Sequence, residues 1–129
     1  MYDSIWYNNL NRPFLAPPAE LFTPIWIILY LTILLALVLY IKKFSIKEKS
    51  IGYVFFSIQL FLNLIWSPVF FGLQNIAFAL IVIFLLDAFV LLTIKRFYII
   101  SKVSAIILFP YFIWILFATY LNIGYLVLN

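Results

Sequence analysis

Charged side chains divide the chain into long uncharged stretches. The first stretch runs from Leu21 to Ile41 and is followed directly by Lys42 and Lys43. The hydrocarbon core of a bilayer is about 30 Å thick, and about 20 apolar helical residues cross it. We therefore predict a first membrane span over residues 21–42.

A second uncharged stretch, from Ile51 to Leu86, is too long for one crossing. A straight helix of that length would measure about 54 Å at ~1.5 Å per residue. We predict a hairpin of two spans, over residues 51–71 and 75–95. The turn is expected between Gly72 and Asn75, because Gly, Gln and Asn suit a short turn.

The last uncharged stretch runs from Val103 to Asn129, and a fourth span is predicted over residues 103–126. The expected fold class is an all-α membrane protein, with four transmembrane helices in an antiparallel bundle. Short loops should make consecutive spans neighbours. Residues 1–20 are expected to form a loop or lid, and residues 1–129 a single domain, since no polar or glycine-rich linker interrupts the chain.

The composition agrees with a chain that lies in lipid. Of the 129 residues, 68% are hydrophobic and 9% are charged, whereas soluble domains have roughly 45–50% and 25%. The chain contains no Cys and no His, which removes thiolate nucleophiles, imidazole bases and the commonest metal ligands. Most enzyme classes are thereby excluded, and no cofactor is expected to be required.

Basic residues other than Arg12 flank the predicted spans and account for the net charge of +4. Membrane topology explains this pattern better than a nucleic-acid partner does. By the positive-inside rule, the loops over residues 42–50 and 95–102 are cytoplasmic, and both chain ends lie on the other side. The expected location is a bacterial cytoplasmic membrane, with lipid as the surrounding partner.

One helical face of the second span carries hydrogen-bonding side chains. Gln59, Asn63 and Ser67 follow one another at intervals of four residues, and Trp66 lies close to the same face. Two interpretations stand. The amides bind a ligand, or they hydrogen-bond neighbouring helices, as polar residues in membrane bundles commonly do.

Aromatic side chains follow helical spacing in the first and fourth spans. The residues of the two stripes are Phe22, Trp26 and Tyr30 in the first span and Tyr111, Trp114, Ala118, Asn122 and Tyr125 in the fourth. Such stripes suit a flat apolar ligand, because ring faces stack on it and an amide binds its polar edge. Core packing and anchoring at the membrane surface are the alternatives.

Asp87 is the one acid inside a predicted span. An intramembrane carboxylate indicates a proton relay or a ligand contact, unless it is protonated or lies near enough to the interface to meet Lys95 or water. No second intramembrane acid or base accompanies Asp87 in the sequence, so these last two interpretations are preferred to a functional one.

Together these residues resemble the tryptophan-rich sensory protein and translocator protein family, also called the TspO/MBR family. The motifs are a Trp-Tyr loop, a Pro-Pro pair, F-x-P-x-W-x-x-x-Y, Q-x-x-x-N-x-x-W-S-x-x-F-F-G and P-Y-x-x-W-x-x-F-A-x-x-L-N. The residues that match are Trp6, Tyr7, Pro17, Pro18, Phe22, Pro24, Trp26, Tyr30, Gln59, Asn63, Trp66, Ser67, Phe70, Phe71, Gly72, Pro110, Tyr111, Trp114, Phe117, Ala118, Leu121 and Asn122. The match covers nearly the whole chain.

The resemblance implies a five-helix bundle with a pocket for porphyrins, such as protoporphyrin IX or heme, and for benzodiazepine-type ligands. Carried over by position, the lining would be Trp26, Tyr30, Asn63, Ser67, Trp114 and Ala118; the stripes add Phe22, Gln59, Trp66 and Asn122. Trp6 would lie in the covering loop, and the stiff stretch with Pro17 and Pro18 would complete the lid. The implied function is that of a membrane receptor, sensor or carrier.

The chain departs from the family pattern in three places. The family's first helix is absent, Leu15 and Ala16 stand where the family has Trp, and no Lys or Arg completes the proposed cholesterol motif of the fourth span. Three explanations are open: a homodimer or a partner subunit replaces the missing helix, the four spans close on themselves, or the chain is shortened. The alternatives to a receptor are a scaffold subunit without its own ligand and a tetrapyrrole-degrading enzyme.

Overall fold

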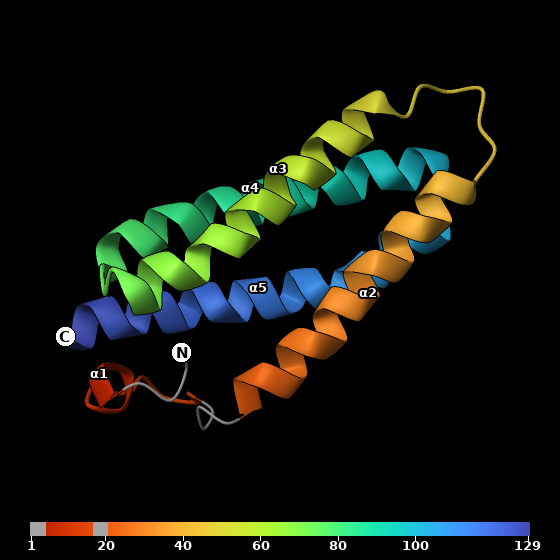
Figure 1. The fold of residues 1–129 in the computed structure, drawn as a ribbon. Coiled ribbons are helices and arrows are strands. Elements are labelled where there is room, and N and C mark those ends of the chain that lie inside the picture. The colour runs from red at the N-terminus through yellow and green to blue at the C-terminus, as the bar shows by residue number, and fades with distance from the viewer. Residues whose placement is uncertain (1–4, 17–20) are drawn as a thin grey trace.

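Four long helices follow a short helical turn near the N-terminus (Figure 1). The structure, a computed structural model, describes residues 5–16 and 21–129. Its elements are α1 (Ile5–Asn8), α2 (Phe22–Lys42), α3 (Ser50–Ser67), the π-helical turn η2 (Pro68–Gly72), α4 (Ile76–Ile100) and α5 (Lys102–Leu128). No strand occurs among these residues. The predicted fold class is confirmed.

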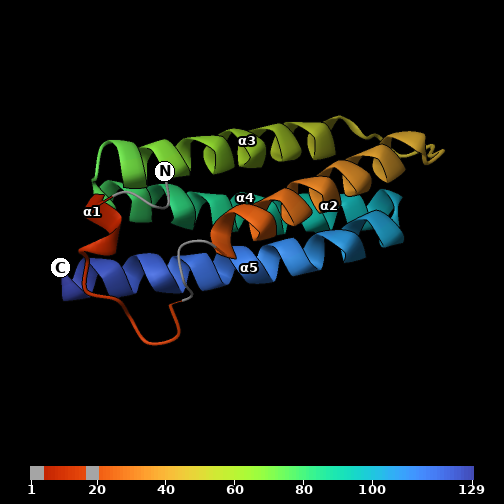
Figure 2. The same cartoon turned by 60° about the horizontal axis from the view of Figure 1, so that its bottom comes forward.

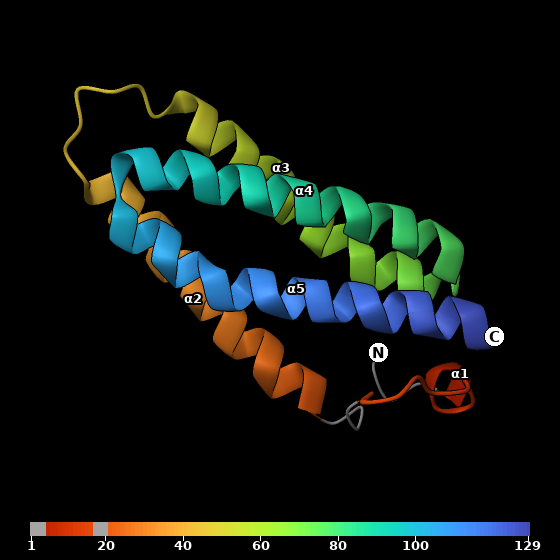
Figure 3. The ribbon, with the colours of Figure 1, turned by 180° about the vertical axis from the view of Figure 1, so that it is seen from behind.

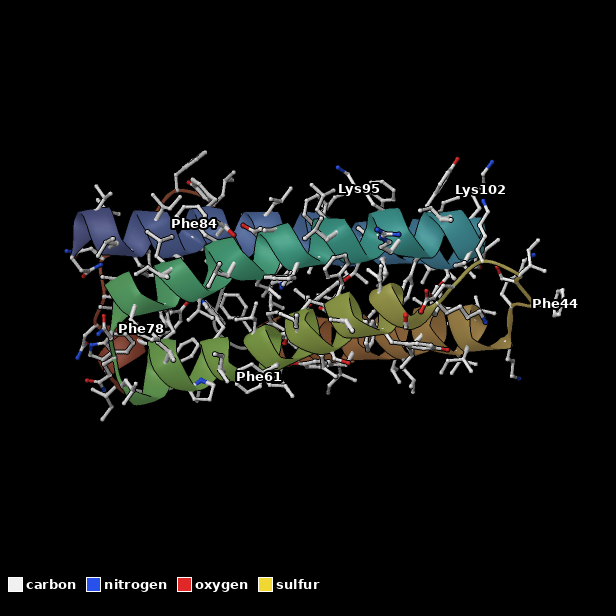
Figure 4. The ribbon with its side chains drawn as sticks, turned by 90° about the horizontal axis from the view of Figure 1, so that it is seen from above. Phe44, Phe61, Phe78, Phe84, Lys95 and Lys102 are labelled. Atoms are coloured by element: carbon white, nitrogen blue, oxygen red, sulfur yellow. The ribbon has the colours of Figure 1, made fainter. Side chains whose placement is uncertain are left out.

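The long helices present apolar side chains to their surroundings. In the described part of the chain, four helices have the length and composition of a membrane span. Phe61, Phe78 and Phe84 are among the many large apolar side chains exposed on the bundle surface (Figure 4). Apolar surface of this extent is unfavourable in water and is typical of contact with lipid. The protein is therefore an integral, multi-pass membrane protein.

The order of the helices in space differs from their order in the chain. α3 packs along α4, α4 along α5, and α5 along α2, whereas α2 and α3 have few contacts with each other (Figures 1 and 3). The expectation that consecutive spans are neighbours is wrong for this first pair. Small side chains explain the pairing of α2 with α5, since Ala36, Ser104 and Ala105 are fully buried and the Ser104 hydroxyl donates to the Ala36 carbonyl.

The turn between α3 and α4 occupies the stretch in which the sequence predicts it. Gln74 adopts the left-handed conformation, with a φ of 54°, which an unbranched residue next to a turn tolerates at some cost. The Asn75 side chain then accepts a hydrogen bond from the Phe78 N–H at 3.0 Å and caps α4. This turn sets α3 and α4 side by side.

The junction between α4 and α5 is shorter than the sequence predicts. Lys95 and Arg96 are expected in a loop, but α4 continues to Ile100 and only Ser101 separates it from α5. The Ser101 hydroxyl accepts a hydrogen bond from the Ser104 N–H at 3.3 Å and caps α5. Lys and Arg are good helix formers with long stems that carry their charge to the membrane surface, so they mark membrane depth without ending the helix.

An aromatic cluster closes the end of the bundle that carries the basic residues. The rings of Tyr40 and Phe97 stack at 3.9 Å, and the Tyr40 hydroxyl donates to the Lys49 carbonyl at 2.8 Å. The Lys49 ammonium donates to the carbonyls of Tyr40 and Ile41, at 2.9 and 3.0 Å, at the C-terminus of α2. A cation at this position is favourable, because helix C-termini carry unpaired carbonyls.

Candidate ligand pocket

Aromatic side chains from α1, α2, α3, η2 and α5 enclose a pocket at the end of the bundle opposite the basic residues. The pocket is lined by Tyr7, Phe22, Trp26, Trp66, Phe70, Phe71, Trp114, Ala118, Leu121, Asn122 and Tyr125. Figure 2 shows α1 lying across this end, beside the C-terminal part of α5. The surface of the pocket is almost entirely apolar.

The structure brings most of the predicted ligand-binding residues together. Those that line the pocket are Phe22, Trp26, Trp66, Trp114, Ala118 and Asn122. Tyr30, Gln59, Asn63 and Ser67 are not part of the lining. The predicted site therefore divides into an aromatic part, which surrounds the pocket, and a polar part on α2 and α3, which lies outside it.

The polar part is a chain of hydrogen bonds between helices. Asn63 Oδ1 accepts from the Tyr30 hydroxyl at 2.5 Å, and Asn63 Nδ2 donates to the Tyr111 hydroxyl at 2.7 Å. The Tyr111 hydroxyl in turn donates to Gln59 Oε1 at 2.8 Å. The two amides are 1% and 4% exposed. This geometry is the one expected of polar side chains that join neighbouring membrane helices.

The indole N–H groups of the pocket differ in their partners. Trp66 Nε1 donates to Asn122 Oδ1 at 3.0 Å, and Asn122 Nδ2 donates to the Ile76 carbonyl at 3.0 Å. Trp114 Nε1 is buried and has no hydrogen-bond partner among the described residues. A buried donor without a partner costs about 1–3 kcal/mol. A ligand with an acceptor atom beside Trp114 would remove that cost.

The rings of the lining meet edge to face. The ring centroids of Trp26 and Trp114 are 6.3 Å apart with an interplanar angle of 87°, and those of Phe22 and Trp114 are 6.1 Å apart at 65°. Such pairs are favourable because the positive edge of one ring meets the negative face of another. Rings from α2 and α5 thereby line the same space.

Tyr7 of α1 fills this space. Its side chain is 2% exposed, and its ring centroid lies 5.1 Å from that of Phe71 and 5.3 Å from that of Tyr125. The Tyr125 hydroxyl donates to the Tyr7 hydroxyl at 2.9 Å. The cavity that remains has a volume of about 20 Å³, room for roughly one water molecule. The pocket is therefore closed by the chain itself.

Of the predicted lid residues, the structure describes Trp6. Its side chain is only partly buried and packs on Phe70 at 5.6 Å, outside the pocket lining. Pro17 and Pro18 lie outside the described residues. In the sequence, Tyr7 stands out only as half of the Trp-Tyr motif, and this motif is the available signal for its place in the lining.

Some lining residues were not predicted as part of the site, although Tyr125 belongs to the predicted stripe of the fourth span. Leu121 shares a helical face with Ala118 and Tyr125, so helical spacing was enough to find it. Phe70 and Phe71 lie in η2, where the wider π-helical turn changes the direction of side chains relative to an α-helix. No pattern in the sequence predicts that change.

Asp87 does not line the pocket. Its Oδ2 accepts a hydrogen bond from the Thr119 hydroxyl of α5 at 2.7 Å. Its Oδ1 is buried without a partner in the described part of the chain, where no ion pair with Lys95 is present either. Of the preferred interpretations, only the pairing with Lys95 does not match this arrangement. Over the same residues, no group of His, Cys, Asp and Glu could hold a metal ion.

Comparison with known proteins places the chain in a family. The model of the TspO/MBR family matches residues 2–128. Over 127 residues, 98% of this chain and 80% of the relative, the chain is 41% identical to the tryptophan-rich protein TspO of Chlorobaculum tepidum. Over 126 residues, 96% of this chain and 80% of the relative, it is 44% identical to the protein of that name from Archaeoglobus fulgidus.

The similarity extends to a human protein. The translocator protein of Homo sapiens is 32% identical over 119 residues, which are 91% of this chain and 70% of the human protein. The resemblance that the motifs indicate is thus confirmed along nearly the whole chain. The chain belongs to the TspO/MBR family.

Proposed function

We propose that the chain binds a planar, largely apolar ligand of the porphyrin class, such as protoporphyrin IX or heme, and acts as a membrane receptor, sensor or carrier. The observation that carries the proposal is the convergence of Trp26, Trp66 and Trp114 on one apolar pocket. Ring faces from several helices stack well on a macrocycle. The unpartnered N–H of Trp114 suits an acceptor atom at its edge.

Recognition in this pocket depends on the macrocycle more than on an iron atom. The chain has no His and no Cys, which are the commonest axial ligands of heme iron together with Met and Tyr. Protoporphyrin IX, which carries no metal, is therefore the appropriate probe. A porphyrin does not fit the cavity of about 20 Å³, so binding requires side chains of the lining to move apart.

The proposal is tested by titrating the purified protein in detergent with protoporphyrin IX and recording porphyrin absorbance. Trp114→Phe keeps an aromatic ring and removes the indole N–H, so the Kd should rise about 3–10-fold, the equivalent of one hydrogen bond. Phe84→Leu, on the exposed surface of α4, is the control and should leave the Kd unchanged. Absence of binding by the unaltered chain, or an equal Kd for Trp114→Phe, would contradict the proposal.

We also propose that the protein lies in a bacterial cytoplasmic membrane with its basic end in the cytoplasm. Lys42, Lys49, Lys95 and Lys102 all lie at the helix ends of one side of the bundle. Cytoplasmic loops of membrane proteins carry an excess of Lys and Arg. The pocket and α1 would then lie toward the opposite face of the membrane.

A second candidate function is that of a subunit completed by a second copy of the chain, and a groove between α2 and α3 favours it. The groove has a volume of about 400 Å³ and is lined by Leu37, Ile41, Tyr53, Phe56, Ser57, Leu60, Phe61 and Leu64. The Ser57 hydroxyl already donates to the Tyr53 carbonyl at 2.8 Å, so the groove suits an uncharged apolar helix. The central parts of α2, α3 and α5 are uncharged, and a second copy supplies such helices.

Cross-linking tests this second candidate. The chain has no native cysteine, so a Leu64→Cys variant reports contacts of the groove alone. A dimer cross-linked through position 64 in native membranes, and not through Phe84→Cys on the surface of α4, would support the second copy. A monomer at both positions would mean that lipid alone fills the groove.

A further inference from the structure

We propose that Asp87 is a proton-binding site inside the membrane: its carboxyl group keeps its proton and donates it to the Thr119 hydroxyl, which donates in turn to the Ile115 carbonyl. The site joins α4 to α5 outside the pocket lining, so the inference does not depend on the proposed porphyrin ligand. Its content is that a neutral acid, and not a carboxylate, connects the two helices.

The first observation is that the oxygens around Thr119 outnumber the available hydrogens. The Thr119 hydroxyl oxygen lies 2.7 Å from Asp87 Oδ2 and 2.9 Å from the Ile115 carbonyl oxygen, and both are ordinary lengths for an O–H···O hydrogen bond. A hydroxyl carries one hydrogen, and neither a carbonyl nor a carboxylate carries any. A single hydrogen shared between the two contacts would meet neither oxygen in a straight line.

A neutral carboxyl group supplies the missing hydrogen. A threonine inside a helix can donate to the carbonyl four residues earlier, which here belongs to Ile115. The contact with Asp87 then needs a hydrogen from the acid. With a carboxylate, Thr119 donates to Asp87 and the contact with Ile115 is left without one. With a protonated Asp87, each of the two contacts contains one hydrogen.

The second observation is the state of the other carboxyl oxygen. Asp87 Oδ1 is buried and has no hydrogen-bond partner among the residues that the structure describes. A buried carboxylate oxygen without a donor or a cation is much more costly than the carbonyl oxygen of a neutral acid, because the carboxylate oxygen carries part of a full charge. The missing partner of Oδ1 therefore also favours the protonated form.

The third observation is the depth of the residue in the bundle. Asp87 lies near the middle of α4, which runs from Ile76 to Ile100. At ~1.5 Å per residue, roughly 16–20 Å of helix separate it from either end. The side chain is half-buried, and at this depth the exposed part meets hydrocarbon. An ionised side chain is costly in such surroundings.

The helices around α4 bring no cation to Asp87. Of the elements that pack on α4, α3 and η2 contain no charged residue, and α5 contains only Lys102, in its first turn. Lys95 is exposed and lies about 12 Å further along α4. The tyrosine hydroxyls of α5 donate to other partners, and Tyr53 of α3 packs on Tyr40 at the basic end. A carboxylate here would lack a counter-ion in the described part of the chain.

The proton also has a consequence for the pocket. Thr119 is followed and preceded on α5 by the lining residues Asn122 and Ala118. The hydrogen bond between Asp87 and Thr119 therefore helps to fix the part of α5 that forms one wall of the pocket.

The first test observes the carboxyl group directly. The chain has two aspartates, Asp3 and Asp87, so an Asp3→Asn variant carries a single one. Infrared spectra of this variant, with isotope-labelled aspartate and in lipid bilayers near neutral pH, should show the C=O stretching band of a protonated acid. The control adds Asp87→Asn and should lose the band. Carboxylate bands in its place would overturn the proposal, and their displacement by Na⁺ would assign the site to a metal ion instead.

The second test examines the direction of donation. Thr119→Val removes the oxygen that accepts the proton, so the C=O band of Asp87 should shift to higher frequency, whereas Thr119→Ser keeps the hydroxyl and should leave the band in place. Thr93→Val is the matched control, because the Thr93 hydroxyl makes the same kind of bond within α4, to the Phe89 carbonyl at 2.7 Å. Thermal unfolding first establishes that each variant is folded. An unmoved band in Thr119→Val, or an equal shift in Thr93→Val, would overturn the proposed contact.

Discussion

At the scale of single residues, hydrogen bonding decides which buried polar groups can meet a ligand. Trp66 and Asn122 use their donors and acceptors on each other and on the Ile76 carbonyl. Asn63 is bonded to Tyr30 and Tyr111. Trp114 keeps a buried N–H without a partner among the described residues. Under the proposed function, polar recognition within the pocket therefore belongs to Trp114.

Asn63→Ala tests the division between the pocket and the polar chain. The substitution removes the acceptor of the Tyr30 hydroxyl and the donor to the Tyr111 hydroxyl, and should lower the free energy of unfolding by about 1–3 kcal/mol. Denaturant unfolding in detergent measures this loss. Under conditions where the variant is folded, its Kd for protoporphyrin IX should equal that of the unaltered chain. A weaker Kd at unchanged stability would show that Asn63 contacts the ligand.

The spacing of residues predicted which side chains share a helical face, but not what each face meets. The stripe of Phe22 and Trp26 and the stripe of Trp114 and Ala118 do converge on the pocket. The face with Gln59 and Asn63 meets Tyr111 instead, because the long Tyr111 side chain of α5 extends its hydroxyl to both amides. Tyr7 belongs to no long helix, so periodicity could not assign it.

At the scale of helices, α2 is held in place by close contacts with other helices at two points along its length. One is the contact of Ala36 with Ser104 of α5. The other is the Tyr40 side chain, which lies over Gly52 of α3 and stacks on Phe97 of α4. A glycine at position 52 is required sterically, since a Cβ there would lie 2.4 Å from the Tyr40 hydroxyl oxygen.

Gly52→Ala should therefore destabilise the bundle. The added methyl group displaces the Tyr40 ring from its stack on Phe97, and overpacking of this kind costs about 1–3 kcal/mol. Gly72→Ala, with open space around its Cβ, is the control. Thermal unfolding of both variants in the same detergent measures the difference, and equal Tm values would contradict this account of the α2 contact.

Helix existence was predictable because apolar length alone specifies a span. The residue at which α4 ends was not predictable from the sequence, because Lys95 and Arg96 stay helical while their charges reach the surface. The spatial order of the helices was not predictable either. Hydropathy contains no information on neighbours, and the pairing of α2 with α5 depends on small residues whose partners are distant in sequence.

At the scale of the whole molecule, the two ends of the bundle differ in chemistry. One end carries the basic residues and is closed by Tyr40, Phe97 and Lys49; Figure 4 shows Lys102 and Phe44 there. The other end contains the pocket, with α1 across it (Figure 2). Under the proposed function, a ligand therefore approaches from the end without basic residues.

Single-cysteine labelling in intact cells tests the proposed orientation. Lys47→Cys lies in the basic loop and Leu73→Cys in the turn at the opposite end, and the chain has no other cysteine. A membrane-impermeant thiol reagent should label position 73 and should label position 47 only after the membrane is opened. The reverse pattern would place the basic end outside and contradict the orientation.

The proposed porphyrin binding depends most on the pocket between α2, η2 and α5. Its most direct test measures protoporphyrin IX binding by a variant in which a larger side chain fills that pocket. Ala118 lines the pocket and is 5% exposed, so Ala118→Leu should abolish binding or weaken it at least tenfold, a loss of about 1.4 kcal/mol. Ala88→Leu, on the exposed surface of α4, should bind as the unaltered chain does. Equal affinity in both variants would show that the ligand binds elsewhere.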